Sequence, residues 1–82
     1  MSDFRVLFVD DEADFLETIL KRMQKRGVAA SGVDSGEAAV TWLQHNPADM
    51  VVLDVRMKGM DGIQTLRAIK SAYPLIEVIM LT

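Results

Sequence analysis

The feature that most constrains the fold is an alternation of short apolar runs with segments whose apolar residues recur at helical spacing. The apolar runs cover residues 6–9, 28–33, 50–53 and 76–81, and each is too short to be a core helix, so we interpret them as strands. Strands that alternate with helices through short connections are typical of a parallel sheet. The sequence therefore predicts the α/β fold class.

Capping signals mark where the intervening helices begin and end. Asp14 with Glu17 predicts a capping box for the first helix, either Asp34 or Ser35 caps the second, and Asp61 with Gln64 predicts a capping box for the third. Gly27 is expected to stop the first helix. The stripes that we expect to be buried are Phe15, Leu16, Ile19, Leu20 and Met23, then Ala38, Ala39, Trp42 and Leu43, then Ile63, Leu66 and Ile69.

Composition removes several classes of function. The 82 residues make one domain or part of one and contain no cysteine and a single histidine, His45, so thiolate and imidazole metal clusters are excluded. No signal peptide and no apolar run long enough for a membrane span is present, so we expect a cytoplasmic protein. The net charge of −3 argues against nucleic-acid binding by this segment.

Acidic residues follow two of the predicted strands. Asp10 and Asp11 come directly after residues 6–9, and Asp54 comes directly after residues 50–53. Parallel strands end at one edge of the sheet, where open α/β sheets bind their ligands. If these two strands are neighbours, three carboxylates converge there, and an all-oxygen site favours Mg²⁺ or a similar hard cation.

A Mg²⁺ site of this kind suits phosphoryl chemistry. Asp54 would be an oxygen nucleophile that accepts a phosphoryl group. Thr82, at the end of the last strand, could donate a hydrogen bond from its hydroxyl to a phosphoryl oxygen. Backbone N–H groups of residues 55–57 could add further donors. The alternative is that Asp54 only forms a turn or caps a helix.

With these residues in place, the chain resembles the receiver domain of two-component response regulators. The matching pieces are VLFVDDE, SGEAA, PADMVVLDVRMKGMDG and IMLT, which span essentially the whole chain. The resemblance implies a flavodoxin-like, doubly wound parallel sheet with strand order 2-1-3-4. It also implies a phosphorylation-dependent signalling switch.

The resemblance assigns a role to each site residue. Asp54 matches the phosphoacceptor, Asp10 and Asp11 match the acidic pair at the Mg²⁺ site, and the Arg56 backbone carbonyl matches the main-chain metal ligand. Thr82 matches the hydroxyl residue that contacts the phosphoryl group and carries the switch. The implied partner is a sensor histidine kinase or phosphotransfer protein, and the signal would pass to an output surface or domain outside this chain.

Two departures from the family pattern stand out. Lys58 replaces the usual proline after Met57, which predicts a looser loop before the third helix. The family's fifth strand and last two helices are absent, so we interpret residues 1–82 as a receiver domain truncated after the fourth strand. The edge of that strand would be unpaired and apolar, which predicts strand pairing, including a possible homodimer.

Two other functions compete with the switch. Aspartate-nucleophile phosphatases require a second aspartate two residues after the nucleophile. This chain has Arg56 at that position, and an arginine cannot act as the general acid. We therefore expect no enzyme beyond assistance to its own phosphorylation. A receiver-like interaction module that is never phosphorylated is the second alternative, but such a module would be expected to have lost some of the three acids.

Overall fold

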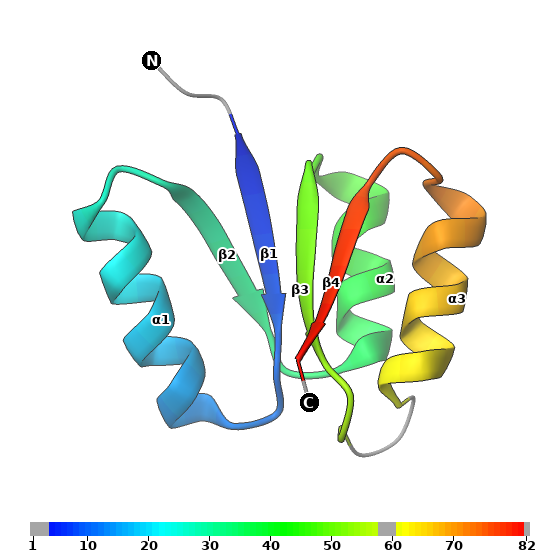
Figure 1. Cartoon of the computed structure of the whole chain (residues 1–82), viewed down its shortest axis with the longest axis horizontal. Coiled ribbons are helices and arrows are strands. Elements are labelled where there is room, and N and C mark those ends of the chain that lie inside the picture. The colour runs from blue at the N-terminus through cyan, green and yellow to red at the C-terminus, as the bar shows by residue number, and fades with distance from the viewer. Residues whose placement is uncertain (1–3, 58–60, 82) are drawn as a thin grey trace.

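The structure is a computed structural model that describes residues 4–57 and 61–81. A four-stranded parallel sheet forms its centre, with strand order β2-β1-β3-β4 (Figure 1). The strands are β1 (Arg5–Val9), β2 (Ala29–Val33), β3 (Met50–Asp54) and β4 (Glu77–Leu81), and the helices are α1 (Ala13–Lys25), α2 (Gly36–His45) and α3 (Gly62–Ala72). The predicted fold class and the order 2-1-3-4 are both confirmed.

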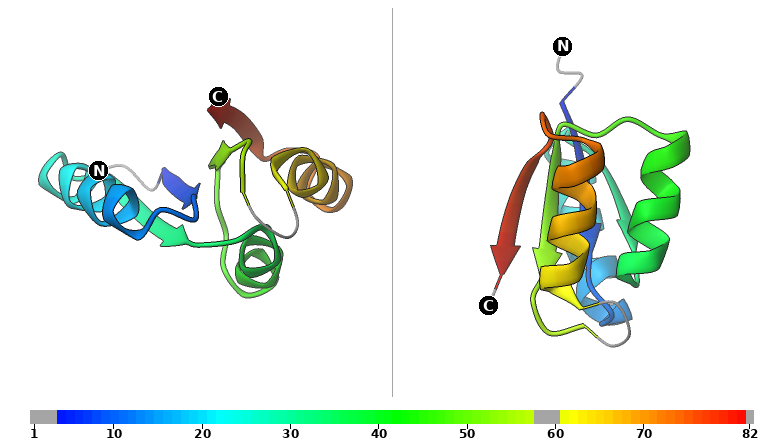
Figure 2. Two further views of the ribbon diagram at one scale, coloured as in Figure 1. Left: turned by 90° about the horizontal axis from the view of Figure 1, so that it is seen from below. Right: turned by 90° about the vertical axis from the view of Figure 1, so that its right-hand side faces the viewer.

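The helices cover the two faces of the sheet unequally. α2 and α3 lie on one face, and α1 lies on the other beside β1 and β2 (Figures 1 and 2). The larger apolar cluster fills the space under α2 and α3, around the fully buried Leu7, Val51 and Leu53. Val6, Phe8 and Leu16 form the smaller cluster under α1. Alternate residues of the central strands therefore enter opposite cores.

Two of the three helix starts follow the sequence signals. The Ser35 hydroxyl oxygen accepts the Ala38 N–H at 3.0 Å, and Asp61 with Gln64 forms the expected capping box. Gly27, at φ 75°, follows the end of α1 in the left-handed conformation that glycine adopts readily. No helix within the described ranges is both long and apolar enough to cross a membrane.

The start of α1 differs from the prediction. The helix begins at Ala13 with Glu12 at the N-cap position, and no side chain caps it. The Leu16 N–H donates to the Glu12 carbonyl, so the first helical turn already includes Asp14. The predicted capping box at Asp14 is therefore wrong, because the turn that follows β1 starts the helix at Ala13, before Asp14.

Two apolar side chains predicted to be buried are exposed. Phe15 is 40% exposed and Ile63 is 44% exposed. The covered stripe of α1 runs through Leu16, Ile19, Leu20 and Met23, and that of α3 runs through Gly62, Thr65 and Ile69. Phe15 stands one residue before Leu16 and Ile63 one residue after Gly62, which turns each side chain about 100° away from that covered position.

Within the described residues, β4 forms one edge of the sheet. In the described part of the chain β4 pairs only with β3, and Ile79 and Leu81 are each 41% exposed. No described helix covers β4 on the face that carries α1 (Figure 2). This edge and the face beside it form an apolar surface.

Candidate functional site

The sheet register brings the acidic residues together. β1 and β3 are neighbours, and Val9 is aligned with Leu53. The next residue of each strand is an aspartate, so Asp10 and Asp54 leave the sheet side by side. Neighbouring strands lie about 4.8 Å apart, which places residues that are distant in sequence within reach of one cation.

The Asp10 side chain is held in place by the chain that follows it. Its Oδ1 atom accepts the Glu12 N–H at 2.9 Å, and the residue is only 9% exposed. Its own N–H donates to the Val33 carbonyl at 3.2 Å, which ties it to β2. Asp10 is thus a nearly buried carboxylate whose orientation is set by the backbone.

Asp54 uses the same local device. Its Oδ1 atom accepts the Arg56 N–H at 3.0 Å, which repeats the i to i+2 bond of Asp10 and is typical of an Asx turn. The following residue, Val55, donates its N–H to the Leu81 carbonyl at 3.1 Å and accepts the Gly62 N–H at 3.3 Å. The end of β3 is therefore attached to both β4 and α3.

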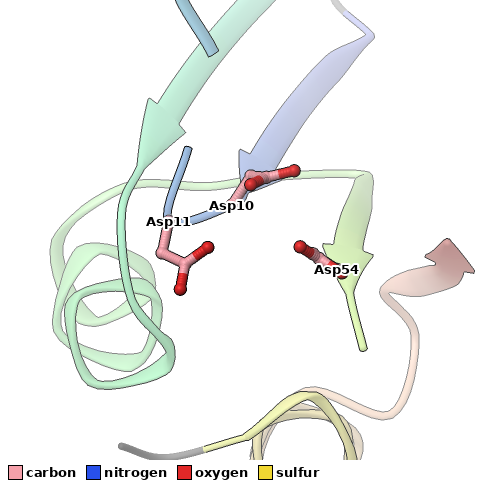
Figure 3. A group of neighbouring side chains, drawn as sticks. All are labelled: Asp10, Asp11 and Asp54. Atoms are coloured by element: carbon pink, nitrogen blue, oxygen red, sulfur yellow. The ribbon is translucent and has the colours of Figure 1, made fainter. Parts of the chain in front are cut away.

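The three carboxylates face a common space at the carboxyl edge of the sheet (Figure 3). One oxygen from each of Asp10, Asp11 and Asp54 lies within 4.8 Å of the others. Two unit charges about 4 Å apart repel by ~1 kcal/mol in water and by ~4 kcal/mol at an effective dielectric constant of about 20. A divalent cation would remove that repulsion.

The donor set fits a hard cation. All three side chains offer carboxylate oxygen, and Mg²⁺ is bound through one or two carboxylates together with water. The bond from the Arg56 N–H places the Arg56 main chain beside the Asp54 carboxylate, while the role of its carbonyl as a ligand stays a prediction. Thr82 lies outside the described residues.

An apolar hollow of about 340 Å³ lies at the opposite edge of the sheet, away from the acids. It is lined by residues that include Leu43, Pro47, Tyr73 and Ile76, and no acidic side chain lines it. It therefore cannot share the chemistry of the acidic group.

The sequence indicated the three acids and offered a turn at Asp54 only as the alternative to a functional role, and it indicated no turn at Asp10. The two Asx turns could have been suspected, because aspartates often bond to the backbone N–H two residues later. The contact of Gly62 with the end of β3 carried no local signal, since it joins residues that meet only in the folded chain.

Together the fold and the acidic group define a doubly wound α/β domain with a candidate cation site at its carboxyl edge. The family model of the response regulator receiver domain matches residues 6–82. The chain belongs to this family, whose general function is phosphorylation-based signalling in two-component systems.

Known proteins agree with this assignment. The heme response regulator HssR of Staphylococcus aureus is 41% identical over 76 residues, which are 93% of this chain and 34% of that protein. HssR of Staphylococcus epidermidis is 33% identical over the same length and the same shares. The chain thus spans about a third of the length of these curated relatives.

Solved structures show the same fold. The N-terminal domain of a response regulator receiver protein from Methanoculleus marisnigri superimposes with a TM-score of 0.90 and 34% identity, covering 99% of this chain and 68% of that one. The response regulator TrrA of Thermotoga maritima, solved in complex with Mg²⁺ and BeF, gives a TM-score of 0.89 and 29% identity, covering 96% of this chain and 69% of that one.

Proposed function

We propose that this chain is the phosphoacceptor part of a two-component signalling switch, with Asp54 as the residue that takes the phosphoryl group. The observation that carries the proposal is the meeting of Asp10, Asp11 and Asp54 within 4.8 Å at the edge where parallel sheets bind ligands. Family membership supports it further. The donor would be a phosphohistidine of a sensor histidine kinase or a phosphotransfer protein.

The reaction is a transfer between two side chains. An Asp54 carboxylate oxygen attacks phosphorus, and the phosphorus–nitrogen bond of the phosphohistidine breaks. The imidazole nitrogen keeps the electron pair of that bond and takes up a proton, which leaves an acyl phosphate on Asp54. The Asx turn supports this role, because it fixes one oxygen on the Arg56 N–H and so orients the carboxylate.

Asp10, Asp11, Asp54 and the Arg56 carbonyl would hold Mg²⁺. When bound, Mg²⁺ supplies charge neutralisation for the phosphoryl oxygens. The contribution of the chain is to keep the three carboxylates together in spite of their repulsion, which the backbone bonds of Asp10 and Asp54 support. Thr82 would contact the phosphoryl group and carry the switch.

The proposed switch includes parts of the protein beyond these site residues. We propose that residues 1–82 are the first part of a receiver domain truncated after β4. The superposition with a solved receiver protein includes 99% of this chain and only 68% of that protein. Phosphorylation would then shift a two-state equilibrium in an output surface or domain outside this segment. The protein would work in the cytoplasm, without nucleic-acid contact through this segment.

The open edge of β4 supports a second partner. Ile79 and Leu81 expose apolar surface beside an edge that no described strand occupies. A flat apolar edge is a template for strand pairing. A homodimer through β4 is therefore proposed for this chain.

The alternatives are less well supported. Receiver domains are generally non-enzymatic signalling domains, and the guanidinium of Arg56 stands where an aspartate-nucleophile phosphatase needs an acid. An interaction module that is never phosphorylated would have no need for three converging carboxylates, whose repulsion costs folding free energy.

The test is phosphorylation of the full-length protein with Mg²⁺ and acetyl phosphate. We expect an acid-stable, base-labile adduct on the native protein and none on Asp54→Asn, which keeps the size of the side chain and loses the nucleophile. Asp61→Asn, an exposed aspartate of the same segment, is the matched control and should still be modified. An adduct that survives Asp54→Asn would refute the assignment, and so would the absence of any adduct on the native protein.

A further inference from the structure

Gly62, the first residue of α3, lies directly against the end of β3 and is buried. A Cβ atom built on Gly62 would lie 2.6 Å from the Val55 Cα and 2.7 Å from the Asp54 carbonyl oxygen. It would also lie 3.0 Å from the Val55 carbonyl oxygen. All three neighbours are backbone atoms, so no flexible side chain can move away to make room.

The backbone conformation of Gly62 does not explain why a glycine stands there. Among the described residues only Gly27 has positive φ, so Gly62 adopts angles that any residue can adopt. Inside a helix alanine is more favourable than glycine by roughly 0.5–1 kcal/mol. Helix propensity alone would therefore favour alanine at this position, and the need for space is the remaining reason for glycine.

The two atoms nearest to this added Cβ atom, the Val55 Cα and the Asp54 carbonyl oxygen, belong to the peptide that joins Asp54 to Val55. The carbonyl oxygen of this peptide is that of Asp54 itself. The N–H group of the same peptide is that of Val55, and it donates to the Leu81 carbonyl. β3 pairs on both sides, with β1 and with β4. A side chain at Gly62 would therefore press on the peptide of the nucleophile, which neighbouring strands otherwise hold in register.

We propose that Gly62 is a positioning residue for the Asp54 carboxylate. Its missing side chain lets the first turn of α3 seat on the Asp54–Val55 peptide, and its N–H donates to the Val55 carbonyl at 3.3 Å. This seat keeps Asp54 aimed at Asp10 and Asp11. The close approach of Gly62 to the end of β3 is independent of function, whereas its effect on phosphoryl transfer rests on the proposed function.

The experiment compares Gly62→Ala with two variants that disturb nearby or similar features without adding an atom against Asp54. Asp61→Ala removes the cap of the same helix, and Gly27→Ala strains a glycine at positive φ, where the added Cβ atom would meet nothing within 4 Å. The first readout is the backbone amide spectrum, followed at the Arg56 N–H because this group donates to Asp54 Oδ1. It requires no metal and no phosphorylation.

The second readout is Mg²⁺ binding, measured as the rise in melting temperature with Mg²⁺ concentration, which also works for a destabilised chain because only the folded state binds. We expect Gly62→Ala to shift the Arg56 amide and to weaken Mg²⁺ binding by about tenfold, as loss of support around metal ligands commonly does. Asp61→Ala and Gly27→Ala should lower the melting temperature and keep the native Mg²⁺ response.

The outcomes separate this inference from the proposed function. A Gly62→Ala protein with an unshifted Arg56 amide and native Mg²⁺ affinity would overturn the positioning role. An equal loss of Mg²⁺ affinity in Asp61→Ala would also overturn it, because that result would assign the effect to the stability of α3. If the native protein showed no Mg²⁺ response, the metal proposal would fail, and the Arg56 amide would still decide the role of Gly62.

Discussion

At the scale of single residues, the site depends on backbone groups that restrain repelling charges. Asp10 and Asp54 each accept an N–H from the residue two positions later, so a similar turn follows both strands. Each bond orients one carboxylate oxygen, which contributes toward offsetting the cost of holding like charges together. The three carboxylates of the proposed site therefore lower the stability of the folded chain through their mutual repulsion.

Replacement of Asp54 by asparagine should stabilise the protein when divalent cations are absent. Asp54→Asn removes one charge from the group and can still accept the Arg56 N–H, so we expect the free energy of unfolding in EDTA to rise by about 1 kcal/mol. Mg²⁺ should stabilise the native protein and not the variant. Urea unfolding with and without Mg²⁺ measures both effects.

The control is Asp14→Asn, an exposed acid in the first turn of α1. It should lower stability slightly, by about 0.3–1 kcal/mol, because it loses a favourable interaction with the helix dipole. A lower stability of Asp54→Asn in EDTA would show that repulsion among the three carboxylates is not the dominant effect.

At the scale of elements, local signals placed the helix starts wherever a polar side chain could reach the first backbone N–H groups. Asp61 was predicted as a cap and Ser35 was one of two candidates beside Asp34, and both Asp61 and Ser35 act as caps. Asp14 carried the same kind of signal and failed, because the turn after Asp10 had already started α1 at Ala13. A local signal thus decides a boundary only when the preceding strand leaves the chain free to use it.

Loss of the Ser35 cap should destabilise the fold without affecting the site. Ser35→Ala leaves the Ala38 N–H without its partner, and we expect the free energy of unfolding to fall by about 1 kcal/mol. Thr41→Ala removes a hydroxyl from an exposed position of the same helix and should change stability by less than about 0.5 kcal/mol, in the stabilising direction. Thermal unfolding by circular dichroism tests the pair. Equal effects would contradict the capping role.

At the scale of the whole molecule, the helices cover the two faces of the sheet unequally. α2 and α3 cover one face, whereas α1 lies beside β1 and β2 on the other face (Figure 2). α2 and α3 therefore cover the larger apolar cluster, and apolar surface remains around β4. A chain of this size buries only about 60–65% of its unfolded surface, so an uncovered apolar face weighs heavily in its stability.

That surface predicts self-association through β4. We expect the protein to show concentration-dependent association in sedimentation velocity, and we expect Ile79→Lys to reduce it, because a charge on an edge strand disfavours pairing. Ile63→Lys is the matched control, since Ile63 is exposed to a similar extent, 44% against 41%, on α3. A native protein that stays a monodisperse monomer and melts cooperatively would refute the homodimer.

The sequence by itself determined the features that depend on neighbouring residues. These are the strand–helix alternation, two of the helix caps, and the aspartates that follow β1 and end β3, because periodicity and capping act over one or two helical turns. The pairing of β1 with β3 was implied by the family resemblance, and only the tertiary structure decided the register that places Asp10 beside Asp54 and that Gly62 must lack a side chain. Strand register and close contacts depend on packing between segments far apart in the chain, and no local pattern records them.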